Sequence, residues 1–237
     1  VAGQVLGGRW KTLQYLYRRS IYSDVMATCG EGGECYVKND APYLFTGNVT
    51  ITALELSTGK TTIVHVLTFG GGQGAPPLAA GAGTSHFFTV DLSAVGSSTH
   101  ILAIECTDDD GGDSTMHNRH RVRPMPAGSR AFGSASLRTV AFNELLLAPP
   151  SALTLPESIV TFTIASAANA DGSIDITLHA TATALYATLT TLAYGRFSDN
   201  AFALAAGNTT VQFVPFGKLD EPTLRKSLRI EHLKQAL

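Results

Sequence analysis

The chain has 237 residues, which is enough for two domains that each bury a hydrophobic core. Hydrophobic residues make up 44% of it and charged residues 15%, a composition that excludes wholesale disorder. Its formal net charge of −2 provides no overall field that would attract nucleic acid or an anionic membrane.

The first predicted element is a helix over residues 9–22, which carries apolar residues at helical spacing. The expected apolar stripe consists of Trp10, Leu13, Tyr17 and Ile21. Basic and aromatic side chains are also found together on protein surfaces that bind nucleic acid. With a net negative chain we instead expect the charges of the helix to face solvent. These charges belong to Arg9, Lys11, Arg18 and Arg19.

From residue 25 onward the sequence predicts short strands. β-Branched residues alternate in residues 49–56 and 61–69, and the turn at 57–60 between them predicts a hairpin. Further strands are predicted at 86–90, 100–105 and 137–142. Because no helical pattern separates these strands, they indicate an antiparallel β-sandwich.

Two long segments interrupt this sandwich. Residues 70–83 are rich in Gly, Ala and Pro and are expected to form a flexible loop. Residues 107–136 are longer and are expected to form a partly disordered surface insertion. Two groups in the insertion could suggest a metal site, but they lack the spacing of a known one, so we expect solvated loops and no metal. These groups are Asp108, Asp109, Asp110 and Asp113, and the pair His117 and His120.

A second set of strands follows Pro149-Pro150, which marks the expected domain boundary. Residues 159–164 and 174–179 flank a turn at 170–173 and predict another hairpin. The other strands of this set are predicted at 184–190, 209–214 and 226–231. Their number and size are typical of an immunoglobulin-like domain.

The cysteines and two glycosylation sequons bear on the cellular compartment. Cys29 and Cys35 flank a short Gly-rich loop and could form a disulfide, with two free thiols as the alternative, whereas Cys106 ends an apolar run and is expected to be a buried thiol. Asn48 and Asn208 begin Asn-x-Thr sequons next to predicted strands and are possible N-glycosylation sites. No apolar run reaches the ~20 residues of a membrane span.

Three segments of the chain carry a resemblance to a known family. Tyr194-Gly195-Arg196-Phe197-Ser198-Asp199-Asn200-Ala201-Phe202 resembles the Gly-Arg-Phe-Ser-Asp-Asn-x-Phe segment of the last immunoglobulin-like domain of β-mannosidases, in glycoside hydrolase family 2. The segment that begins Gly7-Gly8-Arg9 and continues through Trp10 and Lys11 resembles the entry to the last helix of the (β/α)₈ barrel of that family. Residues 143–150 resemble the junction between its two final sandwiches, and Gln14 departs from the usual His.

The resemblance implies an all-β fold of two immunoglobulin-like antiparallel β-sandwiches, preceded by one α-helix left from a (β/α)₈ barrel. The end of the barrel would occupy residues 1–24, and the sandwiches residues 25–150 and 151–237. The start at Val1 lacks the charged and apolar regions of a signal peptide, so we expect the sequence to begin in mid-protein. The motif residues of the 194–202 segment are expected to form a tight corner, with Phe197 and Phe202 in the core and with Asp199 and Asn200 bonding nearby backbone N–H groups.

The resemblance also implies a function. The parent would be a retaining glycosidase that removes terminal, non-reducing β-D-mannose, with both catalytic glutamates on earlier barrel strands. We therefore expect no catalytic residue, cofactor or metal in this chain, whose sandwiches would brace the barrel as their partner. Asn143-Glu144 matches the Asn-Glu dipeptide of the family's acid/base residue, but the Leu-rich and Pro-rich residues after it indicate a different role. The animal enzymes of the family imply a lysosomal glycoprotein.

Two alternatives remain at this stage. Tandem sandwiches also occur as free-standing adhesion or carbohydrate-binding modules, although the chain has one Trp for sugar stacking. Within the same family, the parent could act on glucosaminides, galactosides or glucuronides, because the barrel would select the sugar.

Overall fold

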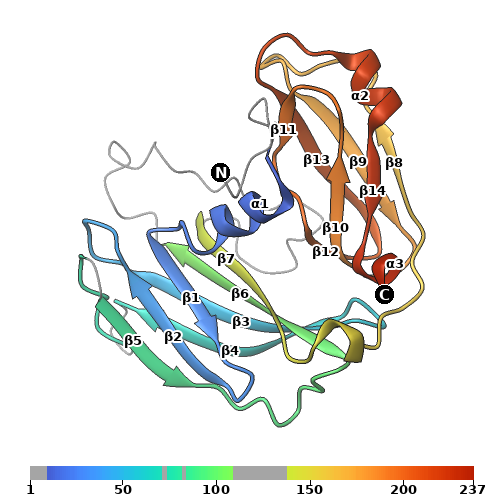
Figure 1. Ribbon diagram of the computed structural model, residues 1–237. Helices are drawn as coiled ribbons and strands as arrows, with labels where there is room; N and C mark the ends of the chain where they lie inside the picture. Colours follow the sequence, from blue (N-terminus) through green and yellow to red (C-terminus); the bar gives the residue numbers. More distant parts are fainter. Residues whose placement is uncertain (1–9, 71–73, 82–83, 109–137) are drawn as a thin grey trace.

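The computed structural model describes residues 10–70, 74–81, 84–108 and 138–237. These residues form two antiparallel β-sandwiches that meet at an angle, and helix α1 (Thr12–Arg19) lies within that angle (Figure 1). Each sandwich packs a three-stranded sheet against a four-stranded sheet. The predicted all-β fold with a helix before the two sandwiches is confirmed.

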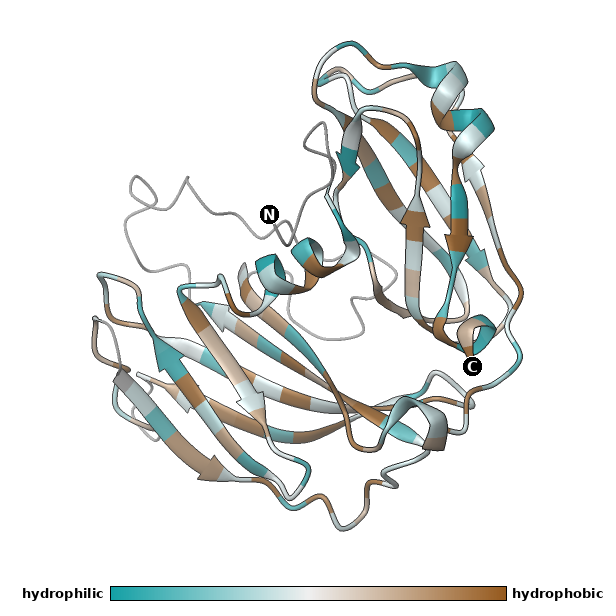
Figure 2. Cartoon of the chain, in the orientation of Figure 1, coloured by the Kyte–Doolittle hydropathy of each residue, from teal (hydrophilic) through white to brown (hydrophobic). Residues whose placement is uncertain are grey.

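The first sandwich buries one face of each of its sheets. Strands alternate between buried and exposed residues, which Figure 2 shows as alternating hydropathy along the strands. Its core includes Val37, Val49, Ile51 and Ile104. The three-stranded sheet has the order β1 (Val25–Cys29), β2 (Glu34–Asn39), β5 (Thr84–Thr89), and the four-stranded sheet has the order β4 (Thr61–Phe69), β3 (Gly47–Glu55), β6 (His100–Asp108), β7 (Arg138–Leu146).

The second sandwich is built in the same way around Ile174, Ile176, Leu178 and Phe213. Its four-stranded sheet has the order β11 (Gly195–Phe197), β13 (Gly207–Pro215), β9 (Ile174–Ala180), β8 (Val160–Ile164), and its three-stranded sheet has the order β12 (Phe202–Leu204), β10 (Ala184–Thr190), β14 (Arg229–Glu231). The other elements are a 3₁₀ turn, η1 (Pro150–Ala152), and two short helices, α2 (Glu221–Ser227) and α3 (Leu233–Ala236).

Helix α1 is shorter than predicted and buries a different face. The expected apolar stripe is wrong, because Leu13 and Ile21 are exposed while Tyr15 and Arg19 are buried. Tyr15 and Arg19 are four residues apart and therefore share one side of the helix. The surface that receives this side offers backbone polar groups and carboxylates to these two side chains, and the ring of Tyr15 also packs into the core of the second sandwich. The expectation that Arg19 faces solvent is also wrong.

Three local predictions need correction. The strand predicted at 226–231 begins only at Arg229, because helix α2 runs to Ser227. Asp220 caps the start of this helix by accepting from the backbone N–H of Thr223. Strands β1 and β2 escaped prediction because they are short and bounded by cysteine and glycine. Within the loop expected at 70–83, Leu78 is buried and exchanges two backbone hydrogen bonds with Phe45.

Most of the predicted insertion lies outside the described residues. Thr107 and Asp108 complete β6, whereas the other proposed metal-ligating residues, from Asp109 to His120, fall in the segment that the structure does not describe. Among the described residues, no group of three His, Cys, Asp or Glu side chains could hold a metal ion. No helix in the same part of the chain is long and apolar enough to cross a membrane.

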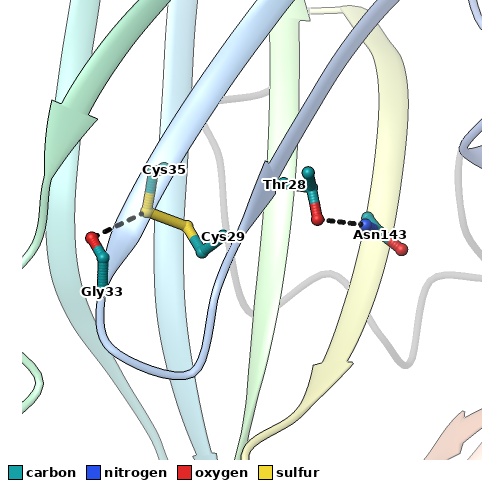
Figure 3. The surroundings of a disulfide bond; sticks show 5 residues. All are labelled: Thr28, Cys29, Gly33, Cys35 and Asn143. Carbon is teal, nitrogen blue, oxygen red and sulfur yellow. Dashed lines mark hydrogen bonds between the residues drawn. A yellow bond between two sulfur atoms is a disulfide. The ribbon is translucent and has the colours of Figure 1, made fainter.

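A disulfide joins β1 and β2 within the first sandwich (Figure 3). Cys29 and Cys35 face each other in the register of the strand pair and are bonded to each other. Gly33, in the connecting turn, has a φ of +89°, and a Cβ there would lie 2.2 Å from the carbonyl oxygen of Val90. At the other edge of β1, the amide of Asn143 donates to the hydroxyl of Thr28 at 3.2 Å and ties β1 to β7. The disulfide and this bond hold β1 on both sides.

The disulfide predicts how many thiols of the chain react in the native, unfolded and reduced protein. Native protein without reductant should not react with a chromogenic thiol reagent, because Cys106 is buried and its burial raises the pKa of the thiol to about 12. Unfolding in denaturant should expose one reactive thiol per chain, and reduction should expose all three cysteines. Cys106→Ala should remove the thiol that appears in denaturant alone. Three thiols in denaturant without reductant would contradict the disulfide.

Candidate functional site: the junction between the sandwiches

Helix α1 closes the open edge of a sheet in the second sandwich. The Tyr15 hydroxyl accepts a hydrogen bond from the backbone N–H of Phe197 at 2.9 Å, and Phe197 belongs to the edge strand β11. Burial raises the pKa of Tyr15 to about 12, so the phenol stays protonated across the working pH range. A buried edge N–H without a partner would cost about 1–3 kcal/mol, which this hydroxyl offsets. The helix is therefore part of the second sandwich.

The guanidinium of Arg19 links this helix to both sandwiches. Nη2 donates to Glu144 of β7 at 3.2 Å, and Nη1 donates to Asp199, in the corner after β11, at 3.1 Å. The same group also donates to the backbone carbonyl oxygens of Asn200 and Ala201. The side chains of Arg19 and Glu144 are only 6% and 4% exposed. We call Arg19, Glu144 and Asp199 the junction cluster.

The second carboxylate oxygen of Glu144 extends the link between domains. Oε1 accepts a hydrogen bond from the backbone N–H of Ala203 at 2.9 Å. Glu144 therefore binds the helix with one oxygen and the second sandwich with the other, while its own strand lies in the first sandwich. Because both oxygens are engaged inside the protein, this carboxylate serves the junction of the domains and not proton transfer to a sugar.

The junction cluster holds two carboxylates against one cation. Burial raises the pKa of Glu144, and the charge of Asp199 raises it further, against the lowering by Arg19 and by the N–H of Ala203. Burial also raises the pKa of Asp199, against the lowering by Arg19, by the N–H of Asn200 and by Arg18. The phenol of Tyr186 faces the same group, and its pKa is raised by burial and by Glu144. The pair of carboxyls therefore takes up a proton more readily than isolated carboxyls would.

The motif at 194–202 forms a corner that also docks onto α1. Phe197 and Phe202 are buried in the core, and the Asn200 side chain bonds the backbone N–H and carbonyl of Leu189 at 2.7 and 2.8 Å. Asp199 accepts hydrogen bonds from the backbone N–H of Asn200 and from the guanidinium of Arg19. It therefore bonds a nearby backbone N–H, as expected, and also connects the corner to helix α1. The left-handed conformation falls at Ala201, with a φ of 55°, rather than at Asp199 or Asn200.

The remaining motif residues support this corner. A Cβ at Gly195 would lie 2.5 Å from the Phe213 ring, so only glycine fits there. The Ser198 hydroxyl accepts from the N–H of Gln212 at 2.9 Å and continues the pairing beyond β11. The guanidinium carbons of Arg196 and Arg18 lie 5.1 and 5.3 Å from the centroid of the Trp10 ring. Lys11, in contrast, is exposed at the start of the helix.

An apolar cluster completes the junction beside these charges. It combines strands of the first sandwich, the segment between the domains and strand β10 of the second sandwich. We call it the linker cluster, and its buried members are Leu54, Leu56, Ile101, Leu153, Leu155 and Leu185. Ala203, which donates to Glu144, packs against the same cluster. Burial of apolar side chains in this way is the dominant favourable term in domain association.

Sequence reasoning named the residues of this site but not their association. The motif at 194–202 identifies Asp199, Glu144 stands out as part of an Asn-Glu dipeptide without a catalytic context, and Arg19 is expected to face solvent. The side chains come together across 125 and 180 residues of sequence. The available signal was an acidic residue inside an apolar strand, which indicates a buried cation nearby. Nothing in the local pattern identified that cation.

Removal of the shared cation should destabilise the chain. Arg19→Ala leaves the buried carboxylate of Glu144 and the partly buried carboxylate of Asp199 without a counter-charge, so we expect the free energy of unfolding at neutral pH to fall by about 3–5 kcal/mol. Arg229→Ala is the matched control, because Arg229 is exposed and bonds only local carbonyls, and it should change stability by less than about 0.5 kcal/mol. Denaturant unfolding measures both variants. Equal, small losses would contradict the role of the junction cluster.

The raised pKa values of Glu144 and Asp199 predict that the junction cluster contributes more to stability in acid than at neutral pH. The contribution of the cluster is complete below the unfolded carboxyl pKa of about 4 and is lost as the pH rises through the folded value. The contribution of the cluster to the free energy of unfolding should therefore fall toward neutral pH, by up to about 1.4 kcal/mol per pH unit for one proton.

Glu144→Gln should flatten this dependence, because one carboxylate then remains for one guanidinium. Glu157→Gln is the control, since the Glu157 side chain is 89% exposed, and it should keep the slope of the unmodified chain. Unfolding curves recorded at a series of pH values provide the measurement. An unchanged slope in Glu144→Gln would show that the proton binds elsewhere.

Comparison with known proteins agrees with this architecture. Residues 155–236 match the Ig_mannosidase family, which is described as an Ig-fold domain. The structure is similar to that of a β-D-mannosidase from Dictyoglomus thermophilum, with a TM-score of 0.57 and 16% identity, over 95% of this chain and 23% of that one. It is also similar to an exo-chitosanase from Amycolatopsis orientalis, with a TM-score of 0.50 and 17% identity, over 89% of this chain and 25% of that one.

The chain thus spans about a quarter of the length of these two enzymes. No curated protein matches its sequence. At these identities the structural similarity establishes the fold, and the resemblance to the corresponding region of a β-mannosidase is confirmed at that level. The second sandwich, with its β11 corner and the strands around it, is the part of the chain that matches the Ig_mannosidase family of Ig-fold domains.

Proposed function

We propose that this chain is the non-catalytic C-terminal region of a family 2 glycoside hydrolase that removes terminal, non-reducing β-D-mannose residues. The match of residues 155–236 to the Ig_mannosidase family supports the proposal, as does the shared fold with a β-D-mannosidase. The similarity to an exo-chitosanase makes glucosaminides the nearest competing substrates. In this proposal the catalytic carboxyl pair lies in a barrel outside this chain.

The role proposed for the sandwiches is to brace that barrel. The observation that carries it is the position of α1, which the junction cluster holds against both sandwiches by one side only. Exposed apolar residues lie on the helix at Leu13 and in the turn that follows it at Ile21 and Tyr22. Exposed apolar residues that gather in one part of the surface mark an interaction site. The barrel of the same parent chain is the partner proposed for it.

We also propose that the parent passes through the secretory pathway to the lysosome. The Cys29–Cys35 disulfide supports this route, because disulfides persist in oxidising compartments and are rare in the cytosol. A junction that is more stable in acid would suit a lysosomal enzyme.

Activity assays on two proteins test the proposal. The full-length protein that contains this chain should hydrolyse an aryl β-D-mannoside faster than the matching glucosaminide, galactoside and glucuronide. The 237-residue chain alone should release no measurable product from any of them. Turnover by the chain alone would overturn the non-catalytic role, and a preference of the full-length protein for glucosaminide would overturn the proposed sugar.

A matched pair of substitutions tests the brace. Ile21 and Ile63 are 54% and 58% exposed, so a change to Glu is tolerated equally well by the isolated chain at either site. In the full-length protein, Ile21→Glu should lower the temperature at which glycosidase activity is lost, because it places a charge against the barrel. Ile63→Glu on β4 should leave that temperature unchanged. Equal effects of the two substitutions would contradict a barrel contact through α1.

A further inference from the structure

The two sequons lie on strands with different surroundings. Asn208 is the second residue of β13, and Asn48 is the second residue of β3. In each strand the Thr of the sequon is two residues further on, so Asn and Thr share one face of their sheet. Both sequons satisfy the sequence rule, and the structure separates them by what surrounds the asparagine.

Asn208 lies at the margin of its sheet. Its backbone pairs with His179 of β9 on one side. On the other side β11 pairs only with residues 213–215 of β13, so it does not reach Asn208. Gly207 precedes it with a φ of +106°, which turns the chain into the strand at this point. The asparagine is exposed to solvent.

The side chain of Asn208 presents its nitrogen outward. Its Oδ1 accepts a hydrogen bond from Nδ1 of His179 at 2.7 Å, while Nε2 of His179 lies 3.3 Å from the Thr163 hydroxyl. Within the described residues no hydrogen bond involves Nδ2 of Asn208. The Thr210 hydroxyl is exposed beside that of Thr177 at 3.4 Å. This face of the sheet is polar around the asparagine, with Thr161, Thr163, Thr177, His179 and Thr210.

Asn48 is enclosed by comparison. Strand β3 is central, and Asn48 pairs with Thr68 of β4 on one side and with Thr107 of β6 on the other. Its Oδ1 accepts from the Thr68 hydroxyl at 2.8 Å, and its carbonyl oxygen accepts from the buried Thr107 hydroxyl at 3.5 Å. A Cβ at the preceding Gly47 would lie 2.0 Å from the Thr107 carbonyl oxygen. A branched sugar on Asn48 would have to cover both neighbouring strands.

We infer that Asn208 is the N-glycosylation site of this chain and that Asn48 is left unmodified in the folded protein. The donor is a lipid-linked diphosphate oligosaccharide of the secretory pathway. Nδ2 of Asn208 attacks the anomeric carbon of the first sugar and loses a proton, the bond from that carbon to the diphosphate oxygen breaks, and the lipid diphosphate leaves. The polar face of β8, β9 and β13 then carries the glycan without loss of any apolar contact.

The test is expression of the 237-residue chain behind a cleavable secretion signal in animal cells. Intact mass is measured before and after treatment with peptide N-glycosidase, which converts a modified Asn to Asp. We expect one glycan per chain, with the new Asp at position 208. Asn208→Gln and Thr210→Ala should each abolish the glycan, Thr210→Ser should retain it, and Asn48→Gln should have no effect on it.

Two further measurements make the result decisive. The membrane fraction of the cells is analysed together with the secreted protein, so that chains retained inside the cell are also scored. Thermal unfolding of bacterially produced Asn208→Gln should match that of the unmodified sequence, since only an exposed hydrogen bond is lost. A glycan on Asn48 in secreted protein, or an unmodified Asn208 in both fractions, would overturn the inference. Neither result depends on which sugar the parent enzyme cleaves.

Discussion

The arrangement of the whole chain depends on one guanidinium shared by two buried carboxylates. Arg19 comes from the helix, Glu144 from the first sandwich and Asp199 from the second, so each part contributes one charge to the same contact. A buried charge is costly unless it is paired, and loss of Arg19 would leave both carboxylates without a counter-charge. The junction cluster therefore holds the helix and the two sandwiches in contact with one another.

The apolar part of the junction has a complementary role. The linker cluster supplies non-directional stabilisation, because leucine side chains from both domains and from the segment between them leave water together. Apolar contacts of this kind permit some sliding, whereas the hydrogen bonds of Arg19, Glu144 and Tyr15 require a defined register. Together they make two sandwiches and a helix into one unit, which is the property that a brace for a larger protein needs.

The sequence was informative where a local pattern decides the outcome. The alternation in residues 61–69, the turn at 57–60 and the turn at 170–173 all predicted elements that the structure contains, because side-chain period and turn chemistry act within a few residues. It failed at β1 and β2, which are stabilised by the Cys29–Cys35 bond and by pairing with β5. It also failed at α2, which has an Asp220 cap and whose last residues, Lys226 and Ser227, were expected to begin a strand. In these places the stabilising partner lies outside the segment.

By itself the sequence determined the all-β class, most of the strands and the corner motif that relates the second sandwich to a family. Only the tertiary structure decided which face of α1 is buried, which acids meet Arg19 and which of two equivalent sequons is open to solvent. The physical reason is the separation along the chain over which each interaction acts. Propensity and alternation act between neighbours in the chain, whereas charge pairing and burial depend on groups that come together only when both sheets of each sandwich have formed.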